Sequence, residues 1–163
     1  AFLAQASEGA PGGGPAAGPA AALARNLATD LVRTFPELGA LLAPASDLYR
    51  ACADVLTAYA AYRPDLRYVQ GMTFICAVVC LSVAPAPAAF QVLANVLHRP
   101  LLRNLYTLGP ATVARVYALH DALLRRHLPA LHARFHAAGV PPDSYLLDWF
   151  LTVFSRALPL DVA

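Results

Sequence analysis

Asp30 and Arg33 lie in the first of two polar segments that stand at predicted helix breaks. They are three residues apart, which places both on one face of a helix. The helix dipole favours a cation in the last turn, and from there the long arginine side chain can extend beyond the protein surface. The segment therefore offers a positive charge that can reach outward or pair with Asp30. Taken alone, the spacing indicates an exposed ion pair worth a few tenths of a kcal/mol.

The second polar segment is Tyr68-Val69-Gln70-Gly71-Met72. Gln70 lies in the turn that opens a very apolar helix. Gly71 has no side chain and allows another backbone to approach closely. Taken alone, this segment indicates an ordinary helix start whose side-chain amide happens to cap the first turn.

The elements that carry both segments are predicted to be helices. Leucines recur at helical spacing from Leu23 to Leu31, and Pro36 ends that helix because the residue before a proline avoids the α region. Ser46 or Asp47 is the expected cap of the next helix. Runs of Val, Ile and Thr are scarce, so we expect an all-α fold. Further helices are predicted over Ser46–Tyr62, Met72–Val83, Ala88–Leu97, Leu101–Tyr106, Ala111–His127, Leu131–Ala138 and Ser144–Leu158.

The chain divides by composition into two parts. Residues 1–22 are rich in Ala, Gly and Pro, with almost nothing to bury after Glu8, and are predicted to be flexible. Residues 23–163 are predicted to form one compact multi-helix domain, since no internal repeat recurs at a fixed period. The segment from Leu158 to Ala163 looks like the beginning of another element, so we expect a domain truncated at its C-terminal end.

Net charge and cysteine content argue against several classes of protein. A formal charge of +2 is too small to indicate binding of nucleic acid. Cys52, Cys76 and Cys80 are odd in number and lie in apolar surroundings, which indicates reduced core residues of a cytosolic protein. Cys76 and Cys80 are four residues apart, whereas a redox or zinc pair has a two-residue spacer. Core packing is therefore favoured over chemistry for all three.

The uncharged stretch from Val69 to Leu97 is long enough to span a bilayer. Pro85 and Pro87 divide it into pieces that are too short to cross singly. Two buried helices are therefore predicted, and an integral membrane protein is the less favoured alternative.

His132 and His136 are one helical turn apart and could ligate a metal. No carboxylate joins them in the sequence pattern and no third ligand is apparent, so no metal site is predicted. Arg125, Arg126 and Arg134 lie nearby. The preferred interpretation is a solvated basic face that could touch an acidic lipid or an acidic partner.

Together the two polar segments resemble signatures of the TBC family of Rab GTPase-activating proteins. Leu27, Asp30 and Arg33 match the first signature, an aliphatic residue followed by Asp and Arg at these spacings. The segment Tyr68–Met72 matches the second, Tyr-any-Gln-Gly-Met. A third region, from Tyr145 to Leu160, also looks like the family.

The resemblance covers residues 23–163 and implies an all-helical, partial TBC domain. Two departures from the family's usual residues are small. Leu27 stands where the family usually has isoleucine, and Thr73 stands where it usually has asparagine or serine.

The resemblance implies a dual-finger mechanism on a Rab-type small GTPase. Arg33 would neutralise the charge that develops on the transferred phosphoryl oxygens, and Gln70 would orient the attacking water. Asp30 and Tyr68 would hold the two fingers in place, and Gly71 would allow a close approach beside them. GTP and Mg²⁺ would come with the GTPase, so the chain would need no cofactor of its own.

The resemblance also implies a cytoplasmic protein of vesicle trafficking that can associate peripherally with endomembranes. A catalytically silent scaffold that binds a GTPase is the alternative, and the presence of both fingers argues against it. If the fingers serve one phosphoryl group, Arg33 and Gln70 must lie on one face in one shallow groove. Asp30 and Tyr68 should line that groove, partly buried and hydrogen-bonded.

Overall fold

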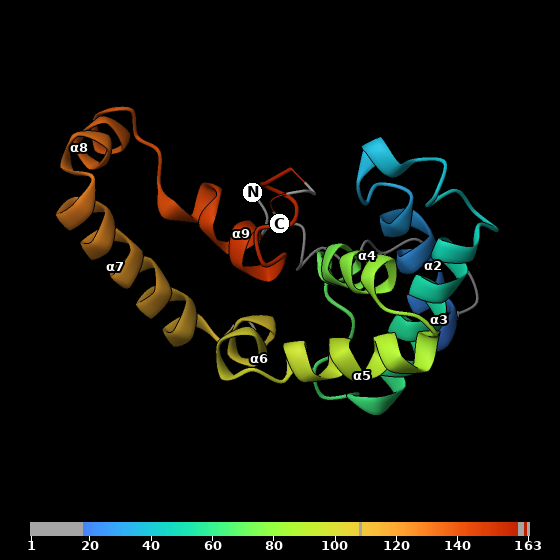
Figure 1. Cartoon of the computed structure of the whole chain (residues 1–163). Coiled ribbons are helices and arrows are strands. Elements are labelled where there is room, and N and C mark those ends of the chain that lie inside the picture. The colour runs from blue at the N-terminus through green and yellow to red at the C-terminus, as the bar shows by residue number, and fades with distance from the viewer. Residues whose placement is uncertain (1–17, 108, 160–161, 163) are drawn as a thin grey trace, which may run out of the picture.

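The computed structural model describes residues 18–107, 109–159 and 162, and within these ranges it contains helices and no strand (Figure 1). The predicted all-α class is therefore confirmed. The elements are α2 (Pro19–Leu31), η1 (Pro36–Leu38), α3 (Asp47–Tyr62), α4 (Met72–Ser82), α5 (Ala86–Leu97), α6 (Pro100–Tyr106), α7 (Pro110–His127), α8 (Pro129–Ala137), η2 (Pro142–Ser144) and α9 (Leu146–Leu151), where η denotes a 3-10 helix.

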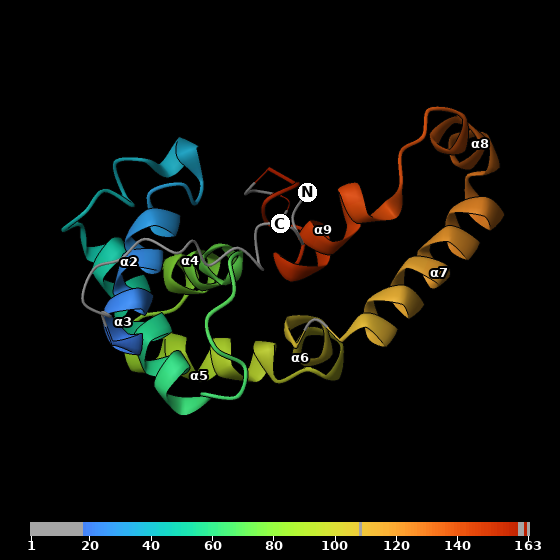
Figure 2. The ribbon, with the colours of Figure 1, turned by 180° about the vertical axis from the view of Figure 1, so that it is seen from behind.

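Helices α2 to α5 pack together at one end of the molecule, with α4 in contact with the other three and on the side that faces α9 (Figures 1 and 2). Helix α4 is apolar almost all round, and such a helix is stable only when it is buried. Helix α5 instead buries one face, formed by Ala89, Leu93 and Leu97. Across the described residues, no helix combines the length and the apolar character needed to cross a membrane.

Helix α3 follows its prediction closely. Ser46 is the N-cap, and its hydroxyl accepts a hydrogen bond from the Tyr49 backbone N–H at 3.1 Å. This bond satisfies one of the amide groups that the first turn leaves without a partner. The buried face of the helix consists of Cys52, Val55, Leu56 and Tyr59.

Both ends of α2 differ from the sequence prediction. The helix begins at Pro19, so residues 19–22 are helical rather than flexible, while residues 1–17 of the predicted flexible segment lie outside the described residues. Proline at the first helical position has a suitable φ, and the alanines that follow favour helix. The helix ends at Leu31, well before Pro36, and Phe35 adopts a left-handed φ of 49°.

The predicted helix over Ser144–Leu158 is too long, because α9 ends at Leu151. The Thr152 hydroxyl donates to the Asp148 carbonyl oxygen at 2.9 Å, and a side chain that bonds the backbone locally competes with helix continuation. Val153 and Phe154 then adopt positive φ values of 50° and 63°. A chain with these angles turns away from the helix axis.

Helices α7 and α8 extend away from the α2–α5 bundle as an arm, and η2 leads the chain back to α9 beside α6 (Figures 1 and 2). The arm has little core of its own, since α7 buries Val113 and α8 buries no residue. Helix α9 is anchored more firmly, because the buried Tyr106 hydroxyl on α6 donates to the carbonyl oxygen of Leu151. The main core is thus formed by α2 to α6 together with α9.

Replacement of Leu93 on α5 tests the position of this core. Its side chain is fully buried, whereas the adjacent Val92 is 38% exposed. We expect Leu93→Ala to lower the free energy of unfolding by about 2–5 kcal/mol, because the truncation leaves a cavity. Val92→Ala is the matched control, and its effect should stay within about 0.5 kcal/mol. Urea denaturation followed by circular dichroism measures both, and equal losses would contradict the assignment of the buried face.

Candidate functional site

A pocket of about 170 Å³ lies where the end of α2 meets the beginning of α4, and we call it the α2–α4 groove. Arg33 and Gln70 both line it, although they are far apart in sequence and stand beside different helices. The prediction that the two polar segments share one groove is therefore confirmed. The lining residues are Asp30, Arg33, Gln70, Gly71, Thr73, Phe74 and Arg156.

Arg33 lies two residues beyond the end of α2 rather than in its last turn. Its backbone N–H donates to the Asp30 carbonyl oxygen at 3.1 Å. The next two residues, Thr34 and Phe35, are buried, so the exposed Arg33 side chain is held at the edge of a fixed turn. Within the described residues Arg33 forms no ion pair, so the interpretation of an Arg33–Asp30 surface pair is wrong.

Asp30 is engaged by Tyr68, whose hydroxyl donates to Asp30 Oδ2 at 2.5 Å. Both residues are half-buried, as expected, but Tyr68 is not among the residues that line the groove, so that part of the prediction is wrong. Burial, and then the hydrogen bond to Asp30, raise the pKa of Tyr68 well above its ordinary value. The phenol therefore stays protonated at neutral pH and keeps donating to the carboxylate. This bond joins the turn before α4 to the last turn of α2.

A second bond joins the same two segments inside the core. The hydroxyl oxygens of Thr34 and Thr73 are hydrogen-bonded at 2.8 Å, and each residue is 1% exposed. The Thr34 hydroxyl oxygen also lies 2.8 Å from the Asp30 carbonyl oxygen, to which it donates. Sequence reasoning did not find this contact. The one hint of this contact in the sequence is Thr73, which stands where the TBC family usually has asparagine or serine.

Gly71 is the N-cap of α4 and adopts a left-handed φ of 102°. This conformation is accessible to glycine and strained for residues with a side chain. A Cβ at Gly71 would lie 3.6 Å from Thr152 Cγ2 and 3.9 Å from the Leu151 carbonyl oxygen, which is ordinary contact. The backbone angle, rather than a lack of space, is thus what requires glycine. The expected close approach is to the end of α9, and Gln70 is exposed just before it.

Arg156 is the charged groove residue that the sequence analysis did not identify, and Thr73 and Phe74 are the other lining residues that it did not identify. Its guanidinium donates to Asp148 Oδ1 at 2.8 Å and lies over the Phe74 ring, 5.7 Å from the ring centroid. Phe74 in turn packs edge-on against Phe35 with ring centroids 5.1 Å apart. The residue belongs to the third segment that looks like the family, but its position depends on the turns after α9. Hydrophobic periodicity does not predict those turns.

The charges of the α2–α4 groove favour the binding of an anionic group. Arg33 and Arg156 contribute two cations to its lining, whereas Asp30 is the one carboxylate among the lining residues. That carboxylate accepts the Tyr68 hydrogen bond, while the Arg33 side chain is exposed. Arg156 is paired with Asp148, so Arg33 is the lining cation that no ion pair offsets in the described part of the chain, and its charge attracts groups of the opposite sign. Phosphates and acidic side chains are therefore the groups that fit.

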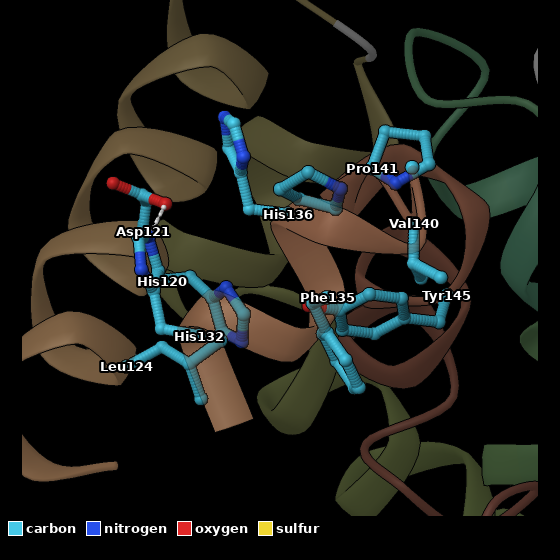
Figure 3. A pocket seen from close by; sticks show the side chains of 11 residues that line it. His120, Asp121, Leu124, His132, Phe135, His136, Val140, Pro141 and Tyr145 are labelled. Carbon is cyan, nitrogen blue, oxygen red and sulfur yellow. Dashed lines mark hydrogen bonds and ion pairs between the residues drawn. The ribbon is translucent and has the colours of Figure 1, made fainter. Parts of the chain in front are cut away.

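A larger pocket of about 330 Å³ lies between α7, α8 and the η2 segment (Figure 3). Asp121 Oδ1 lies 2.9 Å from His132 Nε2. A carboxylate therefore contacts one of the two histidines, whereas the sequence analysis found no carboxylate beside them. The side chain of His132 is 23% exposed, so this histidine is partly withdrawn from solvent. Arg125, Arg126, Arg134 and His136 are exposed, so the predicted solvated basic face is otherwise confirmed. The sequence missed the Asp121–His132 pair because it depends on how α7 packs against α8. This pocket contains none of the predicted finger residues.

Comparison with known proteins matches residues 20–163 to the family model described as Rab-GTPase-TBC domain. The chain is 38% identical over 136 residues to TBC1 domain family member 12 of Xenopus tropicalis. It is 36% identical over 134 residues both to TBC1 domain family member 14 of Homo sapiens and to Drainin of Dictyostelium discoideum. Each alignment covers 82% of this chain, but 19%, 19% and 30% of the respective relative. The chain thus spans less than a third of the length of these relatives.

Substitution of Gly71 tests whether its left-handed backbone holds the groove together. We expect Gly71→Ala to lower the free energy of unfolding by about 1–3 kcal/mol, because a side chain is strained at this φ. Gly109→Ala is the matched control, since Gly109 has a φ of −63° and its Cβ would be 3.9 Å from Thr112 Oγ1. The control should change stability by less than about 0.5 kcal/mol. Denaturant midpoints compare the two, and equal effects would show that Gly71 is not under backbone constraint.

Proposed function

Because the chain belongs to the Rab-GTPase-TBC domain family, we propose that it activates GTP hydrolysis by a Rab-type small GTPase through Arg33 and Gln70. One observation carries this proposal: the two residues come from separate helix ends and line a single pocket. The relatives are much longer than this chain, so the activity of a full-length protein is also part of the proposal.

The chemistry follows from what a small GTPase lacks. GTP hydrolysis builds up negative charge on the phosphoryl oxygens, and the attacking water must be oriented. Arg33 is exposed at the edge of a fixed turn and can enter the nucleotide site of a bound partner. An arginine supplied in trans contributes about 10³–10⁵ in rate, or on the order of 4–7 kcal/mol of barrier.

Gln70 is suited to the second task because its side-chain amide both accepts and donates hydrogen bonds. Its amide oxygen can accept a hydrogen bond from the water, and its NH₂ group can donate one to a phosphoryl oxygen. Gly71 fixes the turn that presents the amide, and the Tyr68–Asp30 bond holds that turn against α2. GTP and Mg²⁺ would be carried by the GTPase, so this chain supplies the two side chains and the surface that positions them.

Arg156 is assigned to partner binding rather than to the reaction. Its guanidinium is oriented by Asp148 and rests on Phe74, so little conformational freedom is lost when a partner carboxylate docks on the remaining donors. The side chain is 48% exposed, which leaves it open to a partner. We assign it the recognition of an acidic side chain on the GTPase.

Replacement of Arg33 by lysine tests the arginine-finger role. Lysine keeps the charge but loses the planar head that bridges two phosphoryl oxygens, so Arg33→Lys should be nearly as inactive as Arg33→Ala. We expect each to lower the single-turnover rate by about 10³-fold or more. The measurement is GTP hydrolysis by a panel of Rab proteins, with Arg115→Ala on the exposed side of α7 as the control.

Binding of the GTPase should change far less than the rate, since the arginine contact matters most in the transition state. A lysine variant that retains most of the rate would contradict the finger role of Arg33. A parent protein that binds a Rab tightly but never accelerates hydrolysis would instead identify a silent scaffold.

Arg156 gives a different kinetic signature. Because it contacts the partner and not the reacting groups, Arg156→Ala should raise KM about three- to tenfold and leave kcat within about twofold. The effect should weaken as salt is added, since salt screens exposed charges. Arg115→Ala again serves as control. A fall in kcat with unchanged KM would contradict the binding role and place Arg156 among the reacting groups.

A further inference from the structure

Three cysteine thiols converge between α3 and α4, where the sequence predicted only core packing. Cys52 comes from α3, and Cys76 and Cys80 come from successive turns of α4. The three Sγ atoms all lie within 4.8 Å of one another, and those of Cys76 and Cys80 are 3.8 Å apart. No other group of three potential ligands from His, Cys, Asp and Glu is as close in the described part of the chain.

We propose that Cys52, Cys76 and Cys80 form a three-thiol site for one trivalent thiophilic ion of the arsenite class. Soft sulfur ligands select soft ions over Mg²⁺ and Ca²⁺, which prefer oxygen. The residues that the GTPase-activating proposal uses are not involved, so the two proposals are independent.

The geometry suits three-coordinate binding. Residues four apart on a helix share one face, so Cys76 and Cys80 present their sulfur atoms together. Cys52 completes a triangle from the neighbouring helix. The thiols make only long, weak hydrogen bonds, as from Cys76 Sγ to the Cys52 carbonyl oxygen at 3.7 Å. Small rotations of these side chains therefore cost little when the sulfur atoms close around an ion.

The charge of the complex selects the ion. Cys52 and Cys76 are fully buried within the hydrophobic core, and Cys80 is half-buried against it. Three thiolates leave a net charge of −2 with Cu(I) and −1 with Zn²⁺, but zero with As(III). Burial of a net charge in an apolar core is costly, so the neutral complex is favoured. Zinc would also need a fourth ligand, because its protein sites are almost always tetrahedral.

The binding step is a substitution without electron transfer. Each thiol sulfur forms an As–S bond to arsenous acid, an As–O bond breaks, and the hydroxide leaves with the thiol proton as water. Three thiols and one As(OH)₃ thus give one As(SR)₃ and three waters. Cys80 is the entry point because it is the most exposed of the three.

Titration of the reduced 163-residue chain with sodium arsenite tests the site. Native mass spectrometry should find one arsenic per chain, and sulfur-to-arsenic absorption in the ultraviolet should saturate at the same ratio. The melting temperature should rise, because a ligand that binds only the folded state stabilises it. Zn²⁺ in a parallel titration should bind more weakly, and tighter binding of Zn²⁺ would overturn the charge argument.

Single substitutions decide whether all three thiols take part. Cys52→Ser, Cys76→Ser and Cys80→Ser should each weaken arsenite binding by about 100-fold or more, since one tethered ligand is lost. Cys80→Ser is the decisive variant because its half-buried position makes it the least disruptive, and circular dichroism verifies its fold. Undiminished arsenite binding by Cys80→Ser, or none by the parent chain, would overturn the proposal.

Discussion

The buried hydrogen bond between the hydroxyls of Thr34 and Thr73 joins the turn after α2 to the first turn of α4. A buried hydroxyl that loses its partner costs about 1–3 kcal/mol, so the two segments separate only at that cost. Arg33 immediately precedes one of these threonines, and Gln70 stands three residues before the other. The relative placement of the two exposed side chains is therefore fixed by a contact beneath the surface. The Tyr68–Asp30 bond supports the same junction nearer the groove.

Much of the fold could be predicted from local patterns. The all-α class, the cap at Ser46 and the buried stripe of α3 follow from composition, capping chemistry and helical spacing, which act over a few residues. The prediction that Arg33 and Gln70 share one groove came from the family signatures. Hydrophobic periodicity could not supply it, because no local pattern requires two helix ends so distant in sequence to meet. Their roles in catalysis stay a prediction, since geometry alone does not report a rate.

The remaining features depend on contacts that a local pattern does not contain. Helix α9 ends early because the Thr152 hydroxyl bonds to the backbone, and only the turns that follow bring Arg156 to the groove. Asp121 meets His132 through the packing of α7 on α8. Cys52 joins the two cysteines of α4 in the same way, from a neighbouring helix. In each case the missing information is the direction in which one element packs on another.

The contact of Gly71 with Leu151 bears on the order in which the groove is completed during synthesis. Helices α2 and α4 leave the ribosome before α9 and Arg156, which follow only after the whole α7–α8 arm has been made. At about 5–20 residues per second, the roughly 80 intervening residues take on the order of 4–16 s. A nascent chain in that interval contains Arg33 and Gln70, but α9 is not yet packed against Gly71 and Arg156 is absent from the groove. The lining of the α2–α4 groove is thus complete only once Arg156 has left the ribosome.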